Sequence, residues 1–407
     1  MGDEGSEHLV RPWQLPNYYY GAGVVGLHQE IEHFYNYILA TPTELAMRAE
    51  TVRRVKNLLL SLWPDACVEV FGSSRTDLFL PASDIDVVVI GYWGRTPLYD
   101  LEKELIARQV ALQGSVCVLD KASVPVVKFT ERESQIKFDI SFNVDTGLKA
   151  AELINEFKHK YPEMPKLVMV LKQFLTMHSL NEVYTGGISS YGLTLMCISF
   201  LQQQIHMKKY KYKNKLGMLL LRFLDFYGRK FDYFKYGISV RGDGSNVERS
   251  QLQTALADYN WQSVLCIEDP ITPTNDIGRS SYAALYVKEA FESAYLKLSK
   301  LVDSDSTKVV GSILGCIVDV PPDVLHYRQW VHRNFQHLSL RGNVSPKYKR
   351  WKHWYCNYDY QHNNNYNLEE FAENVQVDQD STFAGPAIPA ANTVPLGENG
   401  MSFKRYG

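Results

Sequence analysis

Residues 71–74 read Phe-Gly-Ser-Ser, and residues 83–91 read Ser-Asp-Ile-Asp-Val-Val-Val-Ile-Gly. A glycine–serine turn thus precedes two acids at the start of an apolar strand. Because side chains alternate between the two faces of a strand, Asp84 and Asp86 point the same way. Neighbouring carboxylates repel each other unless a cation lies between them, and Mg²⁺ binds one or two carboxylates together with substrate phosphates. The turn can bring backbone N–H groups close to phosphate oxygens, so the stretch predicts a site for a nucleoside triphosphate.

A third acid extends this pattern. Asp139 lies alone in the alternating apolar segment 137–142, where a charge is unfavourable without a partner. Two-metal transfer of a phosphoryl or nucleotidyl group needs such a third carboxylate, because one metal activates the attacking hydroxyl and the other holds the triphosphate. The alternative is that these acids cap turns or pair with lysine and arginine at strand ends. The turn, the acid pair and the later strand aspartate together favour a metal site.

Composition limits the class of protein. The chain has 407 residues, enough for two domains, and its 45% hydrophobic and 22% charged residues are typical of a soluble globular protein. We see no signal peptide and no apolar run of the roughly 18 residues that span a bilayer, so no membrane partner is expected. The six cysteines are scattered without zinc spacing, as in a reduced intracellular protein. With a net charge of -2, either the substrate is small, the basic surface is local, or a partner supplies nucleic-acid affinity.

The hydrophobic periodicity changes near residue 147 and divides the chain into an α/β head and a mainly helical part. We predict a mixed sheet with helices on one side, with strands at 68–71, 86–90, 116–119, 124–129 and 136–142. Helices are predicted at 27–38, 43–62, 98–112, 150–157, 165–178, 190–204, 216–227, 281–301 and 312–318. Thr43 is the expected N-cap of the second helix. The expected organisation is a flexible N-terminus (1–20), a helical segment packing on the central domain (21–42), the head (43–148), the helical central domain (149–325), and a basic–aromatic segment with a disordered tail (326–407).

Longer motifs give a family resemblance. The turn and the three acids resemble the DNA polymerase β-like nucleotidyltransferase superfamily. The chain further resembles the non-canonical poly(A) polymerases, through motifs at 141–143, 147, 150–154, 170–175, 180–183 and 185–188 and a nucleotide recognition motif at 267–270 and 275–282. The branch that serves the nuclear TRAMP surveillance complex is the most similar, over residues 21–320. The resemblance implies a nucleotidyltransferase head and template-independent addition of AMP from ATP to RNA 3′ ends, with Mg²⁺ or Mn²⁺ as cofactor.

The resemblance also implies roles for individual residues around the triphosphate. Asp84, Asp86 and Asp139 are the expected catalytic residues and metal ligands. Gly72 and Ser73 would hold the β- and γ-phosphates, Lys172 would neutralise the triphosphate charge, and Ser190 would add a hydrogen bond to phosphate. The alternatives are a solvated surface lysine at 172 and a simple helix cap at 190.

A second group of residues would contact the ribose and the base. Asn143 and Gly147 are expected along the ribose, although Gly147 also suits a plain turn. Tyr191 would stack on the base, or else be an ordinary core aromatic. Asn275 and Arg279 would sense the base. A related uridylyltransferase branch has histidine where this chain has Asn275, so asparagine favours ATP over UTP.

Two departures from the family pattern bear on activity. Thr176 stands where some relatives have a second lysine, and Ser189 stands where glycine is frequent. Both changes are expected to lower activity without abolishing it. Asp269 and Asp276 are interpreted as loop-organising caps rather than metal ligands.

Two basic segments bear on RNA binding. Residues 347–355 interleave basic and aromatic side chains that can bind phosphates and stack bases, with a solvated basic stretch as the alternative. Residues 208–213 form a second basic loop, which is expected to be simply solvated rather than to bind RNA. The resemblance implies a zinc-knuckle RNA-binding partner, an RNA helicase of an exosome-associated complex, and a nuclear location, with the cytoplasm as an alternative. The rival hypotheses are a terminal uridylyltransferase of the same fold and a catalytically weak scaffold of an RNA complex.

Overall fold

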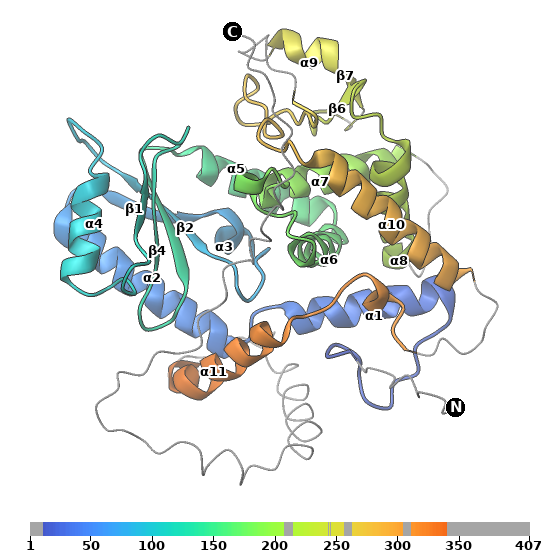
Figure 1. The fold of residues 1–407 in the computed structure, drawn as a ribbon, viewed down its shortest axis with the longest axis horizontal. Coiled ribbons are helices and arrows are strands. Elements are labelled where there is room, and N and C mark those ends of the chain that lie inside the picture. The colour runs from blue at the N-terminus through green and yellow to red at the C-terminus, as the bar shows by residue number, and fades with distance from the viewer. Residues whose placement is uncertain are drawn as a thin grey trace, which may run out of the picture.

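The structure, a computed structural model, describes residues 11–206, 215–242, 244, 246–255, 263–303 and 311–339. It confirms the predicted class: an α/β head with a mixed sheet, joined to a mainly helical part (Figure 1). The basic segments 208–213 and 347–355 and the predicted disordered tail lie outside the described residues. Among the residues predicted to be flexible, Trp13 is fully buried and packs edge-on against Phe34, so residues near it are anchored to the helical part.

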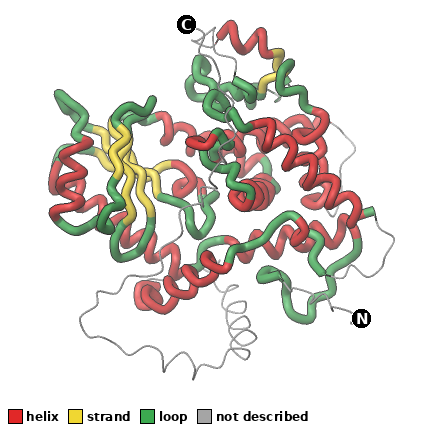
Figure 2. The backbone as a smooth tube through the Cα atoms, in the orientation of Figure 1, coloured by secondary structure: helices red, strands yellow, loops and turns green. Residues whose placement is uncertain are grey.

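The head contains one five-stranded sheet, seen in yellow in Figure 2. Its strands are β1 (Cys67–Phe71), β2 (Ile85–Ile90), β3 (Cys117–Leu119), β4 (Val126–Thr130) and β5 (Lys137–Phe142). The spatial order is β1-β2-β5-β4-β3, with β2 and β5 parallel and all other neighbours antiparallel. In this register Asp86 of β2 lies opposite Asp139 of β5, and Asp139 lies opposite Lys128 of β4.

The two faces of the sheet differ in chemistry. Val87, Val127 and Phe138 lie in the apolar core of the head, with residues of α2 (Pro42–Leu62) and α4 (Leu98–Ala107). Because side chains alternate, Asp86, Asp139 and Lys128 share the opposite face. The strand pattern therefore buries one face under helices and leaves the acids on the other.

Two helix boundaries in the head differ from the prediction. The N-cap of α2 is Thr41 rather than Thr43, because its hydroxyl accepts a hydrogen bond from the backbone N–H of Glu44, whose carboxylate accepts from Thr41 in return. Helix α4 ends at Ala107 rather than near 112, because Gln109 takes a left-handed backbone conformation and Ala111 pairs with Glu131 as a β-bridge.

The helical part is built around one large apolar core. Its helices are α1 (Gly23–Ile38), α5 (Thr146–Lys160), α6 (Met164–Met177), α7 (Ser190–His206), α8 (Lys215–Asp225) and α10 (Ala284–Val302). Helix α1 packs against α6, α8 and α10 although it precedes the head in the sequence (Figure 1). The predicted helix to 227 ends as α8 at Asp225 and continues as a π-helical turn, Phe226–Lys230. The predicted helix 312–318 is only a 3₁₀ turn, Leu314–Cys316.

Smaller elements complete the described part. They are α3 (Gly72–Thr76), β6 (Tyr236–Gly237), β7 (Val247–Glu248), α9 (Arg249–Ala255) and a 3₁₀ turn at Val183–Thr185. None of the helices that the structure describes combines the length and the hydropathy that a bilayer crossing requires.

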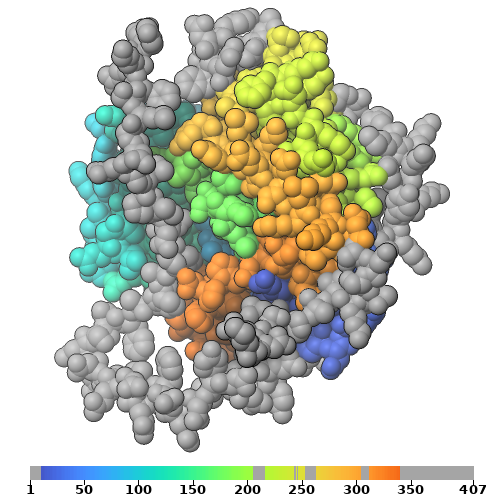
Figure 3. All heavy atoms as spheres, turned by 45° about the vertical axis from the view of Figure 1, so that its right-hand side comes forward, coloured from blue at the N-terminus to red at the C-terminus, as the bar shows by residue number. Residues whose placement is uncertain are grey.

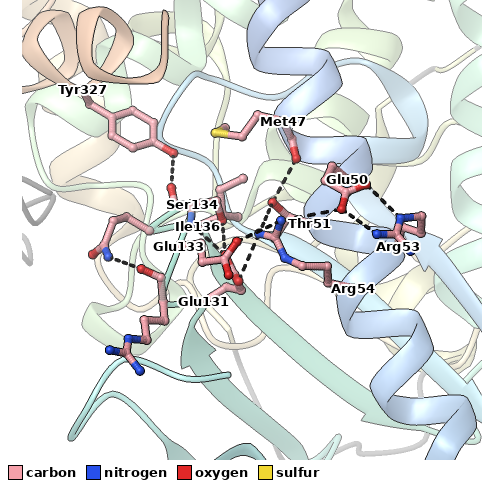
Figure 4. Close-up of polar contacts among 12 residues, drawn as sticks. Met47, Glu50, Thr51, Arg53, Arg54, Glu131, Glu133, Ser134, Ile136 and Tyr327 are labelled. Carbon is pink, nitrogen blue, oxygen red and sulfur yellow. Dashed lines mark hydrogen bonds and ion pairs between the residues drawn. The ribbon is translucent and has the colours of Figure 1, made fainter. Parts of the chain in front are cut away.

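The last described helix was missed by the sequence analysis. Helix α11 (Pro322–Ser339) spans the boundary expected at 325/326, and it returns to the head, where it packs along α2. In Figure 3 its orange surface lies near the blue surface of the N-terminal residues. Figure 4 shows a further tie: the hydroxyl of Tyr327 donates to the carbonyl of Ser134, and Ser134 and Arg54 of α2 both donate to Glu131.

Candidate functional site

A cavity of about 730 Å³ lies between the open face of the sheet and the helical part. Most of the predicted site residues line it: Asp84, Asp86, Asp139, Gly72, Ser73, Gly147, Lys172, Ser190, Tyr191 and Asn275. Thr176 and Ser189, the two departures from the family pattern, lie on its wall as well. The fold thus brings together, in one cavity, residues as distant in the chain as Gly72 and Asn275.

Two predicted site residues do not line this cavity. Asn143 follows β5 at the end of the sheet away from Asp139, about 13 Å along the strand at 3.3 Å per residue. Its side-chain amide accepts a hydrogen bond from the backbone N–H of Gly91 and donates to the carbonyl of Gly91, at 2.9 and 3.0 Å. Asn143 therefore closes a loop with Gly91 outside the cavity lining, and its expected ribose contact stays a prediction. Arg279 is exposed, and its backbone N–H bonds Asp276 outside the cavity lining.

Two of the acids in the cavity have raised pKa values. Burial, together with the charges of Asp84 and Asp139, raises the pKa of Asp86 to about 7. Burial and the charge of Asp84 also raise the pKa of Asp139. The folded protein therefore holds carboxylates that repel one another in a place that water reaches poorly.

A lysine that the sequence analysis did not single out partly offsets this repulsion. Lys128 of β4 lies in register with Asp139, and its ammonium donates a hydrogen bond to that carboxylate. Burial opposes the charge of Lys128, but the neighbouring aspartates raise its pKa above the ordinary value. The signal in the sequence was available, because Lys128 interrupts an apolar strand as Asp139 does.

Gly72 and Gly147 allow the chain to pack tightly around the acids. Gly72 has a φ of +64°, and a Cβ there would lie 2.2 Å from the carboxylate Oδ2 of Asp86. A Cβ on Gly147 would lie 2.4 Å from the ring of Phe71. Only glycine permits both the left-handed backbone at 72 and the close approach of the turn to Asp86.

A second residue missed by the sequence analysis supports the loop that carries Asp84. Arg48 of α2 is buried, and its guanidinium donates to the carbonyls of Ser83 and Asp84, at 2.9 and 3.1 Å. The same group donates to the hydroxyl of Ser74 at 3.3 Å and lies over the ring of Phe79. Arg48 therefore joins the turn at 72–74 to the acid loop.

Lys172 is buried rather than solvated. Its ammonium donates to the carbonyl of Leu78 at 2.6 Å, and the residue is 7% exposed. Burial lowers the pKa of Lys172 to about 8, although Asp84 and Asp86 act in the opposite direction. This position makes Lys172 a cation of the cavity wall with its charge poised near neutral pH.

The base-side residues form a short hydrogen-bonded chain. The hydroxyl of Tyr191 donates to Asp269 Oδ1 at 3.4 Å, and the amide of Asn275 donates to Asp269 Oδ2 at 3.1 Å. Burial raises the pKa of Tyr191, so this hydroxyl stays protonated. Asp276 accepts hydrogen bonds from the backbone N–H groups of Ile267 and Gly278, as a loop-organising residue does.

The donor chemistry of the cavity suits a divalent cation. Among the described residues, no three acidic, histidine or cysteine side chains stand close enough to grip a metal as they are placed. However, Asp84, Asp86 and Asp139 all line one cavity, and burial together with neighbouring acids raises the pKa of Asp86 and of Asp139. Mg²⁺ and Mn²⁺ prefer hard oxygen ligands such as these negatively charged carboxylates. The residues therefore fit the metal chemistry expected for them.

Comparison with known proteins assigns the family. A family model of the central palm domain of mitochondrial-like poly(A) RNA polymerases matches residues 27–159, and a model of Cid1 family poly(A) polymerases matches residues 215–275. The chain is 58% identical over 345 residues to the inactive non-canonical poly(A) RNA polymerase protein Trf4-2 of Drosophila melanogaster, covering 83% of this chain and 84% of that protein. The chain belongs to the non-canonical poly(A) RNA polymerase family. The predicted resemblance is thereby confirmed.

Other relatives in this family are longer than the matched region. The chain is 36% identical over 319 residues to poly(A) RNA polymerase cid14 of Schizosaccharomyces pombe, covering 74% of this chain but 46% of that protein. A solved structure of the polymerase core of TRAMP, an RNA surveillance complex, is 33% identical with a TM-score of 0.65, covering 72% of this chain and 94% of that one. The Cid1 poly(U) polymerase, at 21% identity and a TM-score of 0.59, shares the fold, covering 70% of this chain and 98% of that one.

Proposed function

We propose that this non-canonical poly(A) polymerase family member adds AMP from ATP to RNA 3′ ends without a template. The observation that carries the proposal is the register of Asp86 against Asp139 beside Asp84, in a cavity that also holds Lys172. Such a cavity offers metal ligands, a cation for phosphate and an aromatic ring for a base. Membership of the family supports the same reading.

The residues of the cavity would have different roles in the reaction. Asp84, Asp86 and Asp139 would hold divalent cations, Mg²⁺ or Mn²⁺, which when bound offset the triphosphate charge and acidify the attacking hydroxyl. Asp139 would accept the proton of the RNA 3′-hydroxyl, whose oxygen forms a bond to the α-phosphorus as the bond to pyrophosphate breaks. Lys172 would balance the charge of the triphosphate, and Tyr191 would stack on the adenine.

The turn and the neighbouring helix start would complete the nucleotide site. Gly72 and Ser73 would place backbone N–H groups near the β- and γ-phosphates, and Ser190 would add a hydroxyl donor. Gly147 would leave room beside the ribose. Asn275, tied to Tyr191 through Asp269, would contact the base edge.

A second candidate function rests on a specific observation. The relative that is 58% identical is described as inactive, so a scaffold role in an RNA complex is the rival. Three aspartates that repel one another in a buried cavity favour catalysis, because a scaffold gains nothing from the charge.

The deciding experiment is extension of a labelled oligoadenylate by the full chain. Each of the four nucleoside triphosphates is supplied alone, with Mg²⁺ or Mn²⁺, and with or without a zinc-knuckle RNA-binding protein. We expect long products with ATP, short ones or none with UTP, and stronger extension with the partner. No extension with any nucleotide under these conditions contradicts the proposed activity and leaves the scaffold role.

Partners and location follow from the same family. We propose that the chain works with a zinc-knuckle protein and an RNA helicase in nuclear RNA surveillance or decay, since its relatives include the polymerase core of TRAMP. With a net charge of -2 the chain has no overall excess of positive charge, so we expect it to bind RNA weakly without a partner.

The preference for ATP over UTP, measured in variants of Asn275, tests whether this residue contacts the base. Because Asn275 lines the cavity and bonds Asp269, Asn275→His changes the hydrogen-bonding group that meets the base. One such hydrogen bond is worth roughly 1 kcal/mol, so the ratio of kcat/KM for ATP to that for UTP should fall about fivefold. Competition kinetics with both nucleotides measure it. Asn275→Ala separates loss of the amide from gain of the imidazole; an unchanged ratio in N275H would remove Asn275 from base selection.

Gly72 should be intolerant of any side chain. In Gly72→Ala the new methyl group would press on the Asp86 carboxylate, so we expect kcat to fall about ten- to a hundredfold. Gly114→Ala is a matched control, because Gly114 also has a positive φ of +74° but has open space around its Cβ position. Equal effects of the two substitutions on extension rates would mean that backbone strain, and not contact with Asp86, is responsible.

The pH dependence of ATP binding should report on Lys172. Its ammonium carries charge below a pKa of about 8 and loses it as the pH rises through that value. At pH 9 about a tenth of the free protein keeps the charge, so KM for ATP should rise several-fold between pH 7 and 9. Lys172→Arg should flatten this profile, because arginine stays protonated. A wild-type KM that is constant over this range would place the Lys172 charge outside nucleotide binding.

A further inference from the structure

Two exposed tyrosines lie next to each other on the helical part, and one of them, Tyr184, lines the cavity. Tyr184 is 94% exposed and Tyr282 is 66% exposed. Their segments are far apart in the chain, but the hydroxyl of Tyr282 donates to the carbonyl of Tyr184 at 3.1 Å. A single exposed aromatic is common on protein surfaces, so the pair matters only if the fold holds it in place.

The contacts around Gly186 fix the position of the Tyr282 ring. Gly186 has a φ of +82°, and a Cβ there would lie 2.4 Å from that ring. The backbone N–H of Ala283 donates to the carbonyl of Gly186 at 2.9 Å, and the hydroxyl of Ser281 donates to the carbonyl of Gly187 at 3.0 Å. The ring is therefore packed against bare backbone, and its exposed face is held at little cost in conformational entropy.

The pair lies on the wall that faces Asp139. Tyr184 lines the same cavity as the aspartates, and the charge of its neighbour Glu182 is felt by Asp139. On the opposite wall, Lys137 precedes Asp139 by two residues on β5 and so shares its face of the sheet. The cavity that holds Asp139 is thus lined by a cation, Lys137, and by Tyr184, whose carbonyl accepts a hydrogen bond from Tyr282.

We infer that Tyr184 and Tyr282 form a stacking platform for the last nucleotides of the RNA 3′ end, with Lys137 facing its phosphates. The inference rests on the proposed function, since the RNA 3′ end would have to reach Asp139 in the cavity that Tyr184 also lines. Stacking on tyrosine accepts any base, which suits an enzyme without a template. A protein partner fits less well, because two rings offer about 300–500 Å², below the roughly 800 Å² that each side of a stable interface buries.

The platform is tested by kinetics and by crosslinking. Tyr184→Ala and Tyr282→Ala should each raise KM for an oligoadenylate about tenfold, with kcat and KM for ATP within twofold of wild type. Tyr184→Phe should restore the KM, because phenylalanine keeps the ring. Tyr92→Ala is the matched control, since Tyr92 is fully exposed and lies outside the cavity lining.

Crosslinking gives a readout that needs no catalysis. An oligoadenylate with one 4-thiouridine near its 3′ end should crosslink to Tyr184 or Tyr282 in a chain whose Asp84 and Asp86 are both replaced by asparagine. The yield should fall severalfold in the two alanine variants and stay unchanged in Tyr92→Ala. If the wild type extends no RNA, the proposed function fails, while the crosslink still reports on the platform.

Three results would overturn the platform itself. Crosslinks that map elsewhere, with oligoadenylate KM unchanged in Tyr184→Ala, exclude RNA from these tyrosines. Retained RNA crosslinking together with lost binding of a purified zinc-knuckle protein would assign the tyrosines to a protein partner. A rise in KM for ATP alone in Tyr282→Ala, with no effect of Tyr184→Ala, would give Tyr282 a role in holding the Asn275 loop.

Discussion

The double variant Asp84→Asn, Asp86→Asn is expected to lose RNA extension about a thousandfold or more while remaining folded. Both side chains line the cavity beside Asp139, and asparagine keeps their shape but removes the charge that, in the proposed function, would hold divalent cations. Electrostatic stabilisation of the transition state is usually the largest catalytic contribution, so its loss dominates every other change considered.

Within this double variant, the substitution of Asp86 should make the metal-free protein more stable. Burial and neighbouring acids raise the pKa of Asp86 to about 7, from an ordinary value of 3.8. Because the folded state then binds more protons than the unfolded state between these values, stability falls as the pH rises from about 4 to 7. Asp86→Asn removes that loss, so its thermal midpoint at pH 8 without metal should exceed that of the wild type.

Extension of labelled RNA and thermal unfolding in the presence of a chelator measure the two effects. Asp65→Asn is the control, since Asp65 is exposed and lies outside the cavity. Wild-type rates in the double variant would contradict the catalytic role of the acids. A double variant that is less stable than wild type at pH 8 would show that the aspartates are held by favourable contacts.

The acids of the site could be predicted because their signal is local. A charge inside an apolar strand is unfavourable wherever the strand lies, so Asp86 and Asp139 are visible without a fold. Their pairing is not local: β3 and β4 lie between β2 and β5 in the chain, and only the sheet order makes the two strands neighbours. The sequence therefore predicts which residues carry the chemistry but not the register that brings them together.

Residues that act through buried polar contacts were harder to predict. Arg48 and Lys128 belong to types that are mostly solvated, so their place in a helix or a strand carries little information alone. Asn143 shows the same limit, because its motif predicts a ribose contact, and only the fold shows that its amide closes a loop with Gly91. The family resemblance predicts a polar role for this asparagine, and the fold determines which groups its side chain bonds.

Helix α11 was missed for a related reason. Its buried face includes Arg328 beside Tyr327 and Val331, and a charged residue on that face disguises the apolar periodicity of a helix. The segment therefore looks like the start of a polar tail. Its fold depends on partners in α1 and α2, more than 280 residues earlier in the chain.

Arg328→Met is expected to lower the free energy of unfolding by about 3–5 kcal/mol, as when one partner of a buried ion pair is removed. Its guanidinium donates to both carboxylate oxygens of Glu44, at 2.8 and 3.0 Å, and both side chains are almost fully buried. It also donates to the carbonyls of Tyr37 and Leu39, at 2.8 and 2.9 Å, at the end of α1. Arg328 thus joins α1 of the helical part to the first turn of α2 in the head, and its loss should loosen the junction between them.

Urea unfolding measures the loss, and hydrogen exchange locates it, with faster exchange expected at residues 37–44 and along α11. Arg333→Ala on the exposed side of α11 is the matched control. Adding Glu44→Gln to Arg328→Met should recover part of the stability, because the double variant no longer buries an unpaired carboxylate. An Arg328→Met protein whose free energy of unfolding lies within about 1 kcal/mol of wild type, the contribution of one hydrogen bond, would show that α11 is held to the junction by its apolar contacts instead.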